Sequence, residues 1–140
     1  MKKIICGYSL IFILSFFSLK AEINYFQKGK NLFEDKKYDL AKFKFEQDLV
    51  FNPKNENSYL YLAKIFKFKN DDNQEESNLK TVILLNPKNE EAIYHLALLK
   101  IRKSNYSETK KLLEIFKTNC QNLCQRTAEL TEKLNSITKK

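Results

Sequence analysis

Glycine and proline are scarce in this 140-residue sequence, which contains only two of each. Gly7 lies in an apolar N-terminal run, so Gly29 is the only glycine in the rest of the chain. Phosphate-binding loops of the Rossmann and P-loop kinds are therefore excluded, because they need several closely spaced glycines. Compact β-sandwiches and barrels need many tight turns, which glycine and proline usually form, so the composition favours helices.

Histidine is scarce as well, and this argues against catalysis. His95 is the single histidine, and nothing in the spacing places it beside a nucleophile and an orienting carboxylate. No group of His, Cys, Asp and Glu residues has the spacing of metal ligands. We therefore expect a protein that is not an enzyme, with no catalytic residue, no metal and no cofactor.

Residues 1–21 have the pattern of an export signal. Lys2 and Lys3 precede an uncharged apolar run over residues 4–19. This run is shorter than the roughly 20 residues that span a bilayer, so we predict a cleaved signal peptide, with an uncleaved membrane anchor as the alternative. Both predict an exported protein, periplasmic or attached to the envelope. The segment contains three lysines and no acidic residue, so without it the formal charge falls from +8 to +5.

The sequence repeats itself at a constant interval. The segment Asn-Pro-Lys-Asn-Glu at 52–56 recurs at 86–90, and Leu-Ala at 62–63 recurs at 96–97. Seven of the twelve residues from 52 to 63 are identical to the residues 34 positions later. Such a fixed period is typical of an array of similar structural units.

Positions separated by one such period also share a structural role. Gly29, Ala63 and Ala97 are all small, which lets two helices of one unit approach closely. Asn55 and Asn89 are predicted N-caps of the helices that follow the two prolines. The expected helices span residues 22–35, 38–51, 56–69, 73–85, 90–103, 106–118 and 122–137.

On these features the chain resembles the tetratricopeptide repeat family, whose 34-residue units are helix–turn–helix hairpins. The resemblance covers three repeats, at about 22–55, 56–89 and 90–123, followed by a closing helix at about 122–137. It implies an all-α solenoid domain over residues 22–140. The closing helix either caps the third repeat or is offered to a partner.

Several polar residues depart from the family pattern. Glu75 stands where the first repeat has Ala41, and Asp48 replaces another small residue. Lys28 and Lys100 stand in columns, meaning sets of equivalent positions 34 residues apart, whose other members are apolar. We expect either loose packing around Glu75 or a shifted second helix in the middle repeat.

The resemblance implies a non-enzymatic scaffold for protein–protein interaction. In the family, the first helix of each hairpin lines a concave groove that receives a peptide or helix from a partner, and some family members are accessory subunits of envelope assembly or secretion complexes. By register, the lining residues are Phe26, Lys30, Phe33, Leu60, Lys64, Lys67, Tyr94, Leu98 and Ile101. Their helical spacing also fits a core role for some of them. Such a groove suits an extended or helical segment with hydrophobic anchors and some acidic character.

The basic charge supports an alternative function. With a pI near 9.3, the lysines could bind an anionic membrane surface or another polyanion; predicted export makes nucleic acid the weaker candidate.

Cys120 and Cys124 are the only cysteines after residue 21. In an exported protein they close a disulfide if a turn separates them, and they remain buried thiols if one helix contains both.

Overall fold

The computed structural model describes residues 24–138. The signal-peptide prediction for residues 1–21 lies outside this part of the chain. Within it the structure has seven helices and no strand, so the predicted all-α architecture is confirmed. The helices are α1 (Tyr25–Glu34), α2 (Tyr38–Phe51), α3 (Glu56–Phe68), α4 (Asp72–Leu85), α5 (Glu90–Arg102), α6 (Tyr106–Asn119) and α7 (Arg126–Thr138).

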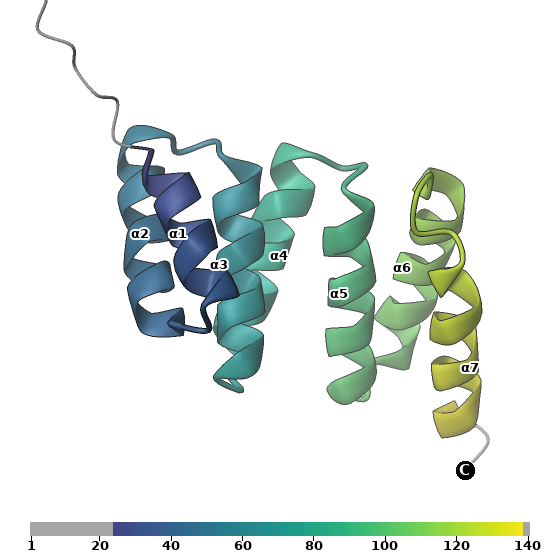
Figure 1. The fold of residues 1–140 in the computed structure, drawn as a ribbon. Helices are drawn as coiled ribbons and strands as arrows, with labels where there is room; N and C mark the ends of the chain where they lie inside the picture. The colour runs from purple at the N-terminus through teal and green to yellow at the C-terminus, as the bar shows by residue number, and fades with distance from the viewer. Residues whose placement is uncertain (1–23, 139–140) are drawn as a thin grey trace, which may run out of the picture.

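The helices form two layers (Figure 1). Helices α1, α3, α5 and α7 make one layer, and α2, α4 and α6 make the other. Each hairpin packs against the next, and α7 packs against both α5 and α6. Among residues 24–138, no helix combines the length and the apolar character needed to cross a bilayer.

The repeat period holds at the level of helix boundaries. Helices α2, α4 and α6 begin at Tyr38, Asp72 and Tyr106, and α3 and α5 begin at Glu56 and Glu90. The second helix of the middle repeat is therefore in register with its counterparts, and the shift considered from the sequence does not occur.

The turn inside each hairpin uses one left-handed residue. Lys36, Asn70 and Ser104, which are equivalent positions of the three repeats, have φ of 60°, 55° and 55°. In the first turn, the Lys37 N–H donates to the Leu32 carbonyl at 2.8 Å, which closes the end of α1. The turn geometry is the same in all three repeats although no glycine is present to ease it.

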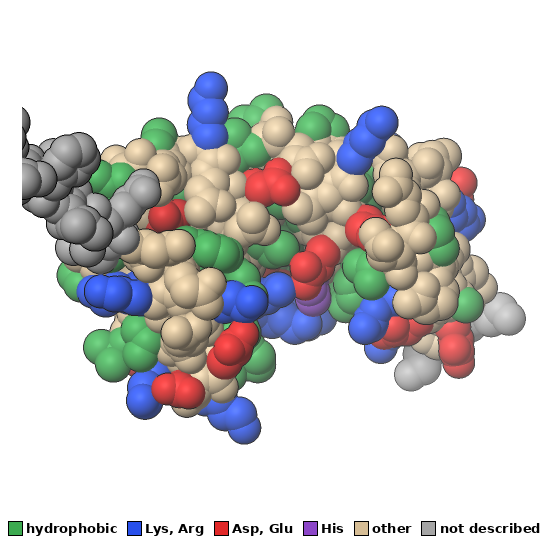
Figure 2. Space-filling view, turned by 45° about the horizontal axis from the view of Figure 1, so that its top comes forward, with side chains coloured by type: hydrophobic (Ala, Val, Ile, Leu, Met, Phe, Trp, Pro, Cys, Tyr) green, Lys and Arg blue, Asp and Glu red, His purple; other side chains and the backbone are tan. Residues whose placement is uncertain are grey.

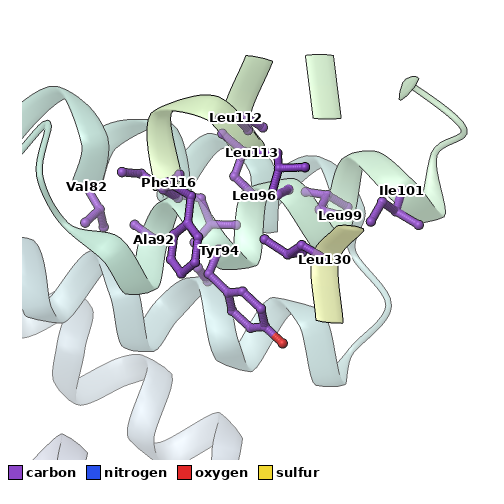
Figure 3. Packing of buried hydrophobic residues seen from close by; sticks show 14 of the residues in the cluster. Val82, Ala92, Tyr94, Leu96, Leu99, Ile101, Leu112, Leu113, Phe116 and Leu130 are labelled. Carbon is purple, nitrogen blue, oxygen red and sulfur yellow. The ribbon is translucent and has the colours of Figure 1, made fainter. Parts of the chain in front are cut away.

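The core has two parts. The first lies between α1, α2 and α3 and contains the buried side chains of Ala41, Phe45, Leu62 and Ile65. The second is larger and reaches from Leu60 on α3 to Leu134 on α7. Figure 3 shows part of it, from Val82 to Leu130. Each repeat buries its apolar side chains against a neighbouring repeat, as stacked helical units do.

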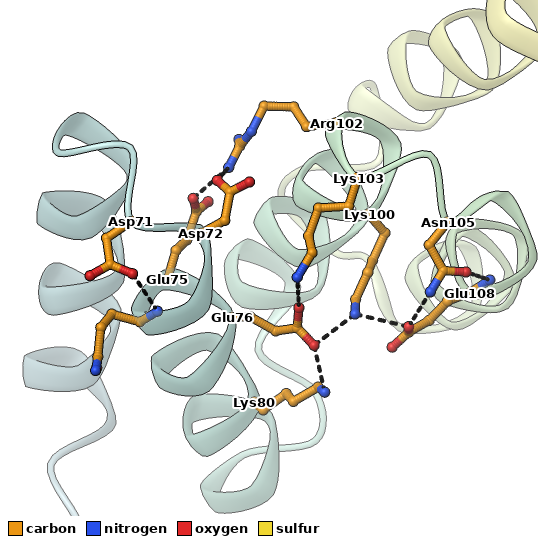
Figure 4. A network of polar contacts seen from close by, with 11 residues as sticks. Asp71, Asp72, Glu75, Glu76, Lys80, Lys100, Arg102, Lys103, Asn105 and Glu108 are labelled. Carbon is orange, nitrogen blue, oxygen red and sulfur yellow. Dashed lines mark hydrogen bonds and ion pairs between the residues drawn. The ribbon is translucent and has the colours of Figure 1, made fainter.

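The buried charges that depart from the family pattern form ion pairs between repeats (Figure 4). The Glu75 side chain is 1% exposed, and its Oε2 lies 2.6 Å from the Arg102 Nη2. The Lys100 Nζ lies 2.7 Å from Glu76 Oε1 and 2.9 Å from Glu108 Oε2. Where the sequence predicts loose packing, Glu75 is buried, and a cation from the next repeat neutralises its carboxylate.

Asp48 is also fully paired. Its carboxylate accepts hydrogen bonds from Ser58 Oγ and Asn55 Nδ2, both at 2.6 Å, and from Asn52 Nδ2 at 3.1 Å. Asn52 and Asn55 belong to the loop between the first two repeats, and Ser58 belongs to α3. The buried acid thus ties α2 to the repeat that follows it.

The last helix begins later than the sequence predicts. Helix α7 starts at Arg126 rather than at residue 122. The reason is Glu90, whose carboxylate accepts the backbone N–H groups of residues 121–123 at 2.8 to 3.1 Å. Backbone groups that bind this carboxylate are held in a loop, so the helix begins only after them.

Cys120 and Cys124 lie in the same loop. The structure joins their sulfur atoms in a disulfide, with the Cα atoms 5.1 Å apart. Cys120 is the C-cap of α6, and both cysteines precede α7. One continuous helix does not contain them, so the loop geometry is compatible with a bond.

Candidate functional site

The surface formed by α1, α3 and α5 carries the candidate site. It is hollowed between the N-terminal half and the last helix, and acidic, basic and histidine side chains gather there (Figure 2). We call this surface the groove face. Its accessible side chains are those of Gln27, Lys30, Phe33, Tyr61, Lys64, Lys67, Glu91, His95 and Leu98.

Aromatic rings form the N-terminal part of the groove face. The Phe33 ring lies edge-on to Tyr61, with centroids 5.1 Å apart, and Phe26 lies edge-on to the same ring at 5.8 Å. Tyr61 also stacks on the buried Phe45 at 5.0 Å. These contacts fix the rings while leaving Phe33 and Tyr61 only half-buried, which provides a rigid apolar surface for a ligand.

A charged group connects α3 to α5 beside these rings. The Lys64 Nζ lies 2.7 Å from Glu91 Oε1 and 4.8 Å from the centroid of the Tyr61 ring. His95 Nε2 lies 3.7 Å from the same Glu91 oxygen. His95 and then Lys64 hold the pKa of Glu91 at about 2, although burial acts in the opposite direction. Glu91 is therefore ionised at neutral pH and fixes the position of Lys64.

His95 carries an unpaired polar atom. Its Nδ1 is buried and has no hydrogen-bond partner among the described residues. One turn away, Leu98 is half-buried and packs against the larger core cluster. The C-terminal part of the groove face thus combines an imidazole with an apolar side chain.

Three of the predicted lining residues belong to the core. Leu60 and Tyr94 are 4% and 5% exposed, and Ile101 is 9% exposed. They pack within the larger apolar cluster and do not line an open surface. Phe26, which is in register with Leu60 and Tyr94, is half-buried against Tyr61 of the next repeat. For Leu60 and Tyr94 the error arises because this repeat position points toward the next repeat or α7. Ile101 stands at the repeat position of Phe33 and Lys67, but the larger apolar cluster buries it.

The side chains one position later in each repeat lie on the groove face instead. Gln27, Tyr61 and His95, also equivalent positions of the three repeats, stand one position later and remain accessible. One residue turns the side chain by about 100° around a helix, which is enough to move it from the interface to the surface. The period was readable from the sequence, but it does not indicate which column faces outward.

The remaining predicted residues lie on the groove face. Lys30, Lys64 and Lys67 are half-buried, but they do not form a row of free cations. Lys64 is bound to Glu91, and Lys30 Nζ lies 3.9 Å from Glu34 Oε1. An ion pair as exposed as the latter contributes little, so Lys30 and Lys67 remain available to an anionic ligand.

Helix α7 closes the C-terminal end of this surface. The Tyr94 hydroxyl donates to Glu129 Oε2 at 2.9 Å and accepts from Arg126 Nη1 at 3.1 Å. The apolar side of α7 is buried through Leu130 and Leu134. Helix α7 therefore caps the third repeat, and its apolar side is not offered to a partner.

Metal binding has no support in the described part of the chain. Residues 24–138 contain no group of three or more His, Cys, Asp or Glu side chains that could hold a metal ion. The chemistry available on the groove face is that of apolar, aromatic and ionic contacts.

Known structures resemble this chain in fold, whereas the two sequence comparisons find no match. No family model matches the chain, and no curated protein matches it. The translocator chaperone SycD of Yersinia enterocolitica superposes with a TM-score of 0.75 at 15% identity, covering 83% of this chain and 84% of SycD. The TPR2B domain of yeast Sti1 superposes at 0.73 with 15% identity, covering 80% of this chain and 94% of that domain. The chain has a tetratricopeptide-repeat fold.

Structures with this fold include complexes with peptides. The first tetratricopeptide-repeat domain of Spaghetti (RPAP3) was solved bound to the HSP90 peptide SRMEEVD, and it superposes at 0.72 with 20% identity, covering 81% of this chain and 93% of that domain. SycD was also solved with a peptide of the translocator YopD. These neighbours are protein-binding domains.

Proposed function

We propose that this protein is an interaction scaffold that binds a segment of another protein on its groove face. The observation that carries the proposal is the accessible group of Tyr61, Lys64, Glu91 and His95, which bridges two repeats. These side chains are held by their own contacts, so a ligand need not order them, and this lowers the entropic cost of binding. The peptide complexes of proteins with the same fold support this mode of binding.

The groove face defines the chemistry of the partner segment. Half-buried Phe33 and Leu98 suit hydrophobic anchors, and Lys30 and Lys67 suit acidic side chains. Because Glu91 already pairs with Lys64, the centre of the surface is electrostatically satisfied. We therefore propose an extended or helical segment with apolar anchors and acidic residues.

We place this function in a bacterial envelope, in an assembly or secretion complex that the protein serves as an accessory subunit. The support is the signal-like pattern of residues 1–21. Mass spectrometry of the protein isolated from cell fractions tests it. An N-terminus near residue 22 in the periplasmic fraction would indicate cleavage, and an intact N-terminus in the membrane fraction would indicate an anchor. Recovery of the intact chain in the cytoplasm alone would refute export.

Charge reversal tests the groove. In cells, a photocrosslinking residue at Gln27 captures the partner, and the yield is compared after adding Lys30→Glu and Lys67→Glu. We expect a loss of at least about tenfold, because like charges brought together at an interface are costly. The matched control is Lys110→Glu with Lys111→Glu, which makes the same charge change on the exposed side of α6. Equal yields from the two double variants would refute the groove.

A further inference from the structure

The outer side of α2 is unusually apolar. Leu40, Phe43 and Val50 are 57%, 54% and 76% exposed, and Phe51 at the end of the helix is 67% exposed. The first three lie on one side of the helix, away from the buried Phe45, and the same side carries Asp39 and Glu46, which form ion pairs with Lys69 and Lys42. We call these four residues the α2 outer face.

The other repeats show that packing does not require this apolar character. The positions of Leu40, Phe43 and Val50 correspond to Gln74, Ser77 and Leu84 in α4 and to Glu108, Lys111 and Thr118 in α6. Only α2 has an apolar residue at all three positions. An exposed apolar patch that a repeat fold does not need is a sign of an interaction surface.

Two lysines lie on the N-terminal end of the solenoid, and one of them contacts the α2 outer face. Lys28 and Lys44 occupy columns that are buried in the later repeats, where the residues are Leu62 and Leu96, and Asn78 and Leu112. The Lys44 Nζ lies 5.2 Å from the Phe43 ring centroid and 5.6 Å from that of Tyr25. Neither lysine forms an ion pair with an acidic side chain of residues 24–138.

The N-terminal apolar run leads to this same face. Tyr25, at the start of α1, stacks on Phe51 with ring centroids 5.5 Å apart, so the chain reaches the domain beside the α2 outer face. Only residues 20–23 separate the apolar run from Asn24. Even fully extended, they cover no more than about 17 Å. When the apolar run is retained as the uncleaved anchor, the bilayer that holds it therefore lies next to this face.

We propose that the α2 outer face docks on an anionic membrane surface, with its apolar side chains in the interface and Lys28 and Lys44 at the lipid phosphates. Lysine suits this position because its stem can lie along apolar surface while its ammonium group reaches the headgroups. The groove residues lie on α1, α3 and α5, so a protein docked through α2 keeps the groove face open to a partner. The proposal applies to the chain that keeps its N-terminal run as an anchor, and it does not depend on the groove function.

Other occupants fit less well. Two copies meeting through this face would bring Lys28 and Lys44 of both copies together, which opposes association. A preceding repeat would have to bury Lys28 and Lys44, whose counterparts in the inner repeats are uncharged.

Tryptophan fluorescence tests the docking, because the chain contains no tryptophan. Phe43→Trp places a single probe on the α2 outer face, and Lys111→Trp places one at the same repeat position of α6. The full chain is reconstituted in phosphatidylcholine vesicles with and without phosphatidylglycerol, each containing brominated lipid as a quencher. We expect a blue shift and quenching for Phe43→Trp that are strongest in the anionic vesicles, and neither effect for Lys111→Trp.

A second variant separates docking from attachment by residues 1–23. Adding Leu40→Gln and Val50→Thr to Phe43→Trp introduces residues that α4 and α6 carry at these positions, so the fold should be kept, as circular dichroism verifies. We expect the quenching to fall to the level of the Lys111→Trp control. Unquenched Phe43→Trp emission in anionic vesicles overturns the proposal. A blue shift that needs no lipid and grows with protein concentration also overturns it, because it indicates a second copy on this face.

Discussion

At the scale of single residues, Gly29 and Phe45 form a matched pair between α1 and α2. A Cβ atom at Gly29 would lie 2.8 Å from the Phe45 Cε1, and this ring is fully buried. We expect Gly29→Ala to lower the free energy of unfolding by about 1–2 kcal/mol, because overpacking outweighs the gain in helix propensity. Urea denaturation followed by circular dichroism measures the loss.

The second repeat supplies the control for this pair. There Ala63 and Leu79 take the places of Gly29 and Phe45. Phe45→Leu alone should destabilise the protein by leaving a void, but in the Gly29→Ala background it should recover stability. The double-mutant cycle should show a favourable coupling of at least about 1 kcal/mol. Additive effects would mean that the two side chains do not limit each other.

At the scale of helices, the start of α2 lacks a cap that the other second helices have. Asp71 and Asn105 accept the N–H groups of Gln74 and Glu108, whereas Lys37, in the same column, makes no side-chain cap. Lys37→Asp should raise the free energy of unfolding by about 1 kcal/mol in urea denaturation. Lys37→Ala removes the same lysine without supplying an acceptor, so a gain from Lys37→Ala as large as that from Lys37→Asp would contradict the capping explanation.

The ion-pair network between α4 and α5 makes the free energy of unfolding depend on pH. Hydrogen bonds from Lys100, then Lys80 and Lys103, lower the pKa of Glu76 from 4.5 to about 2. Because the folded pKa is the lower one, the stabilisation is present above the unfolded value and is lost as the pH falls from about 5 toward 2. We expect Glu76→Gln to be less stable at neutral pH and to lose less stability over this range.

Urea denaturation at several pH values measures this effect. Glu132→Gln, on the exposed side of α7, makes the same change outside the network and should keep the wild-type pH dependence. If Glu76→Gln lost as much stability between pH 5 and 2 as the wild-type protein, its carboxylate would not be the group that titrates.

At the scale of the whole molecule, the C-terminal cap is held mainly by burial. The Cys120–Cys124 bond closes a very short loop, so replacing both residues by serine should cost no more than about 2 kcal/mol. Leu130 is fully buried between α7 and the third repeat, and Leu130→Ala should cost about 2–5 kcal/mol. Urea denaturation ranks the two variants, and a larger loss from the serine variant would show that the disulfide dominates. Peptide mapping without reductant tests the bond itself.

The sequence by itself determined the repeat. The repeat period, the small residues at Gly29 and Ala63 and the caps at Asn55 and Asn89 are local features, and the observed helices follow them. The caps were readable because a helix end depends on residues within one turn, and the small residues were readable because they recur at the repeat period.

Only the tertiary structure decided which columns face outward and how the buried charges are satisfied. Tyr61 lies on the groove face and Leu60 in the core because one residue turns a side chain by about 100°, and only the neighbouring repeat shows which direction is covered. The partner of Glu75 is Arg102, 27 residues away, and Glu90 delays the start of α7 from more than 30 residues away. Contacts over such separations arise from the stacking of whole repeats, which is the physical reason that local sequence did not reveal them.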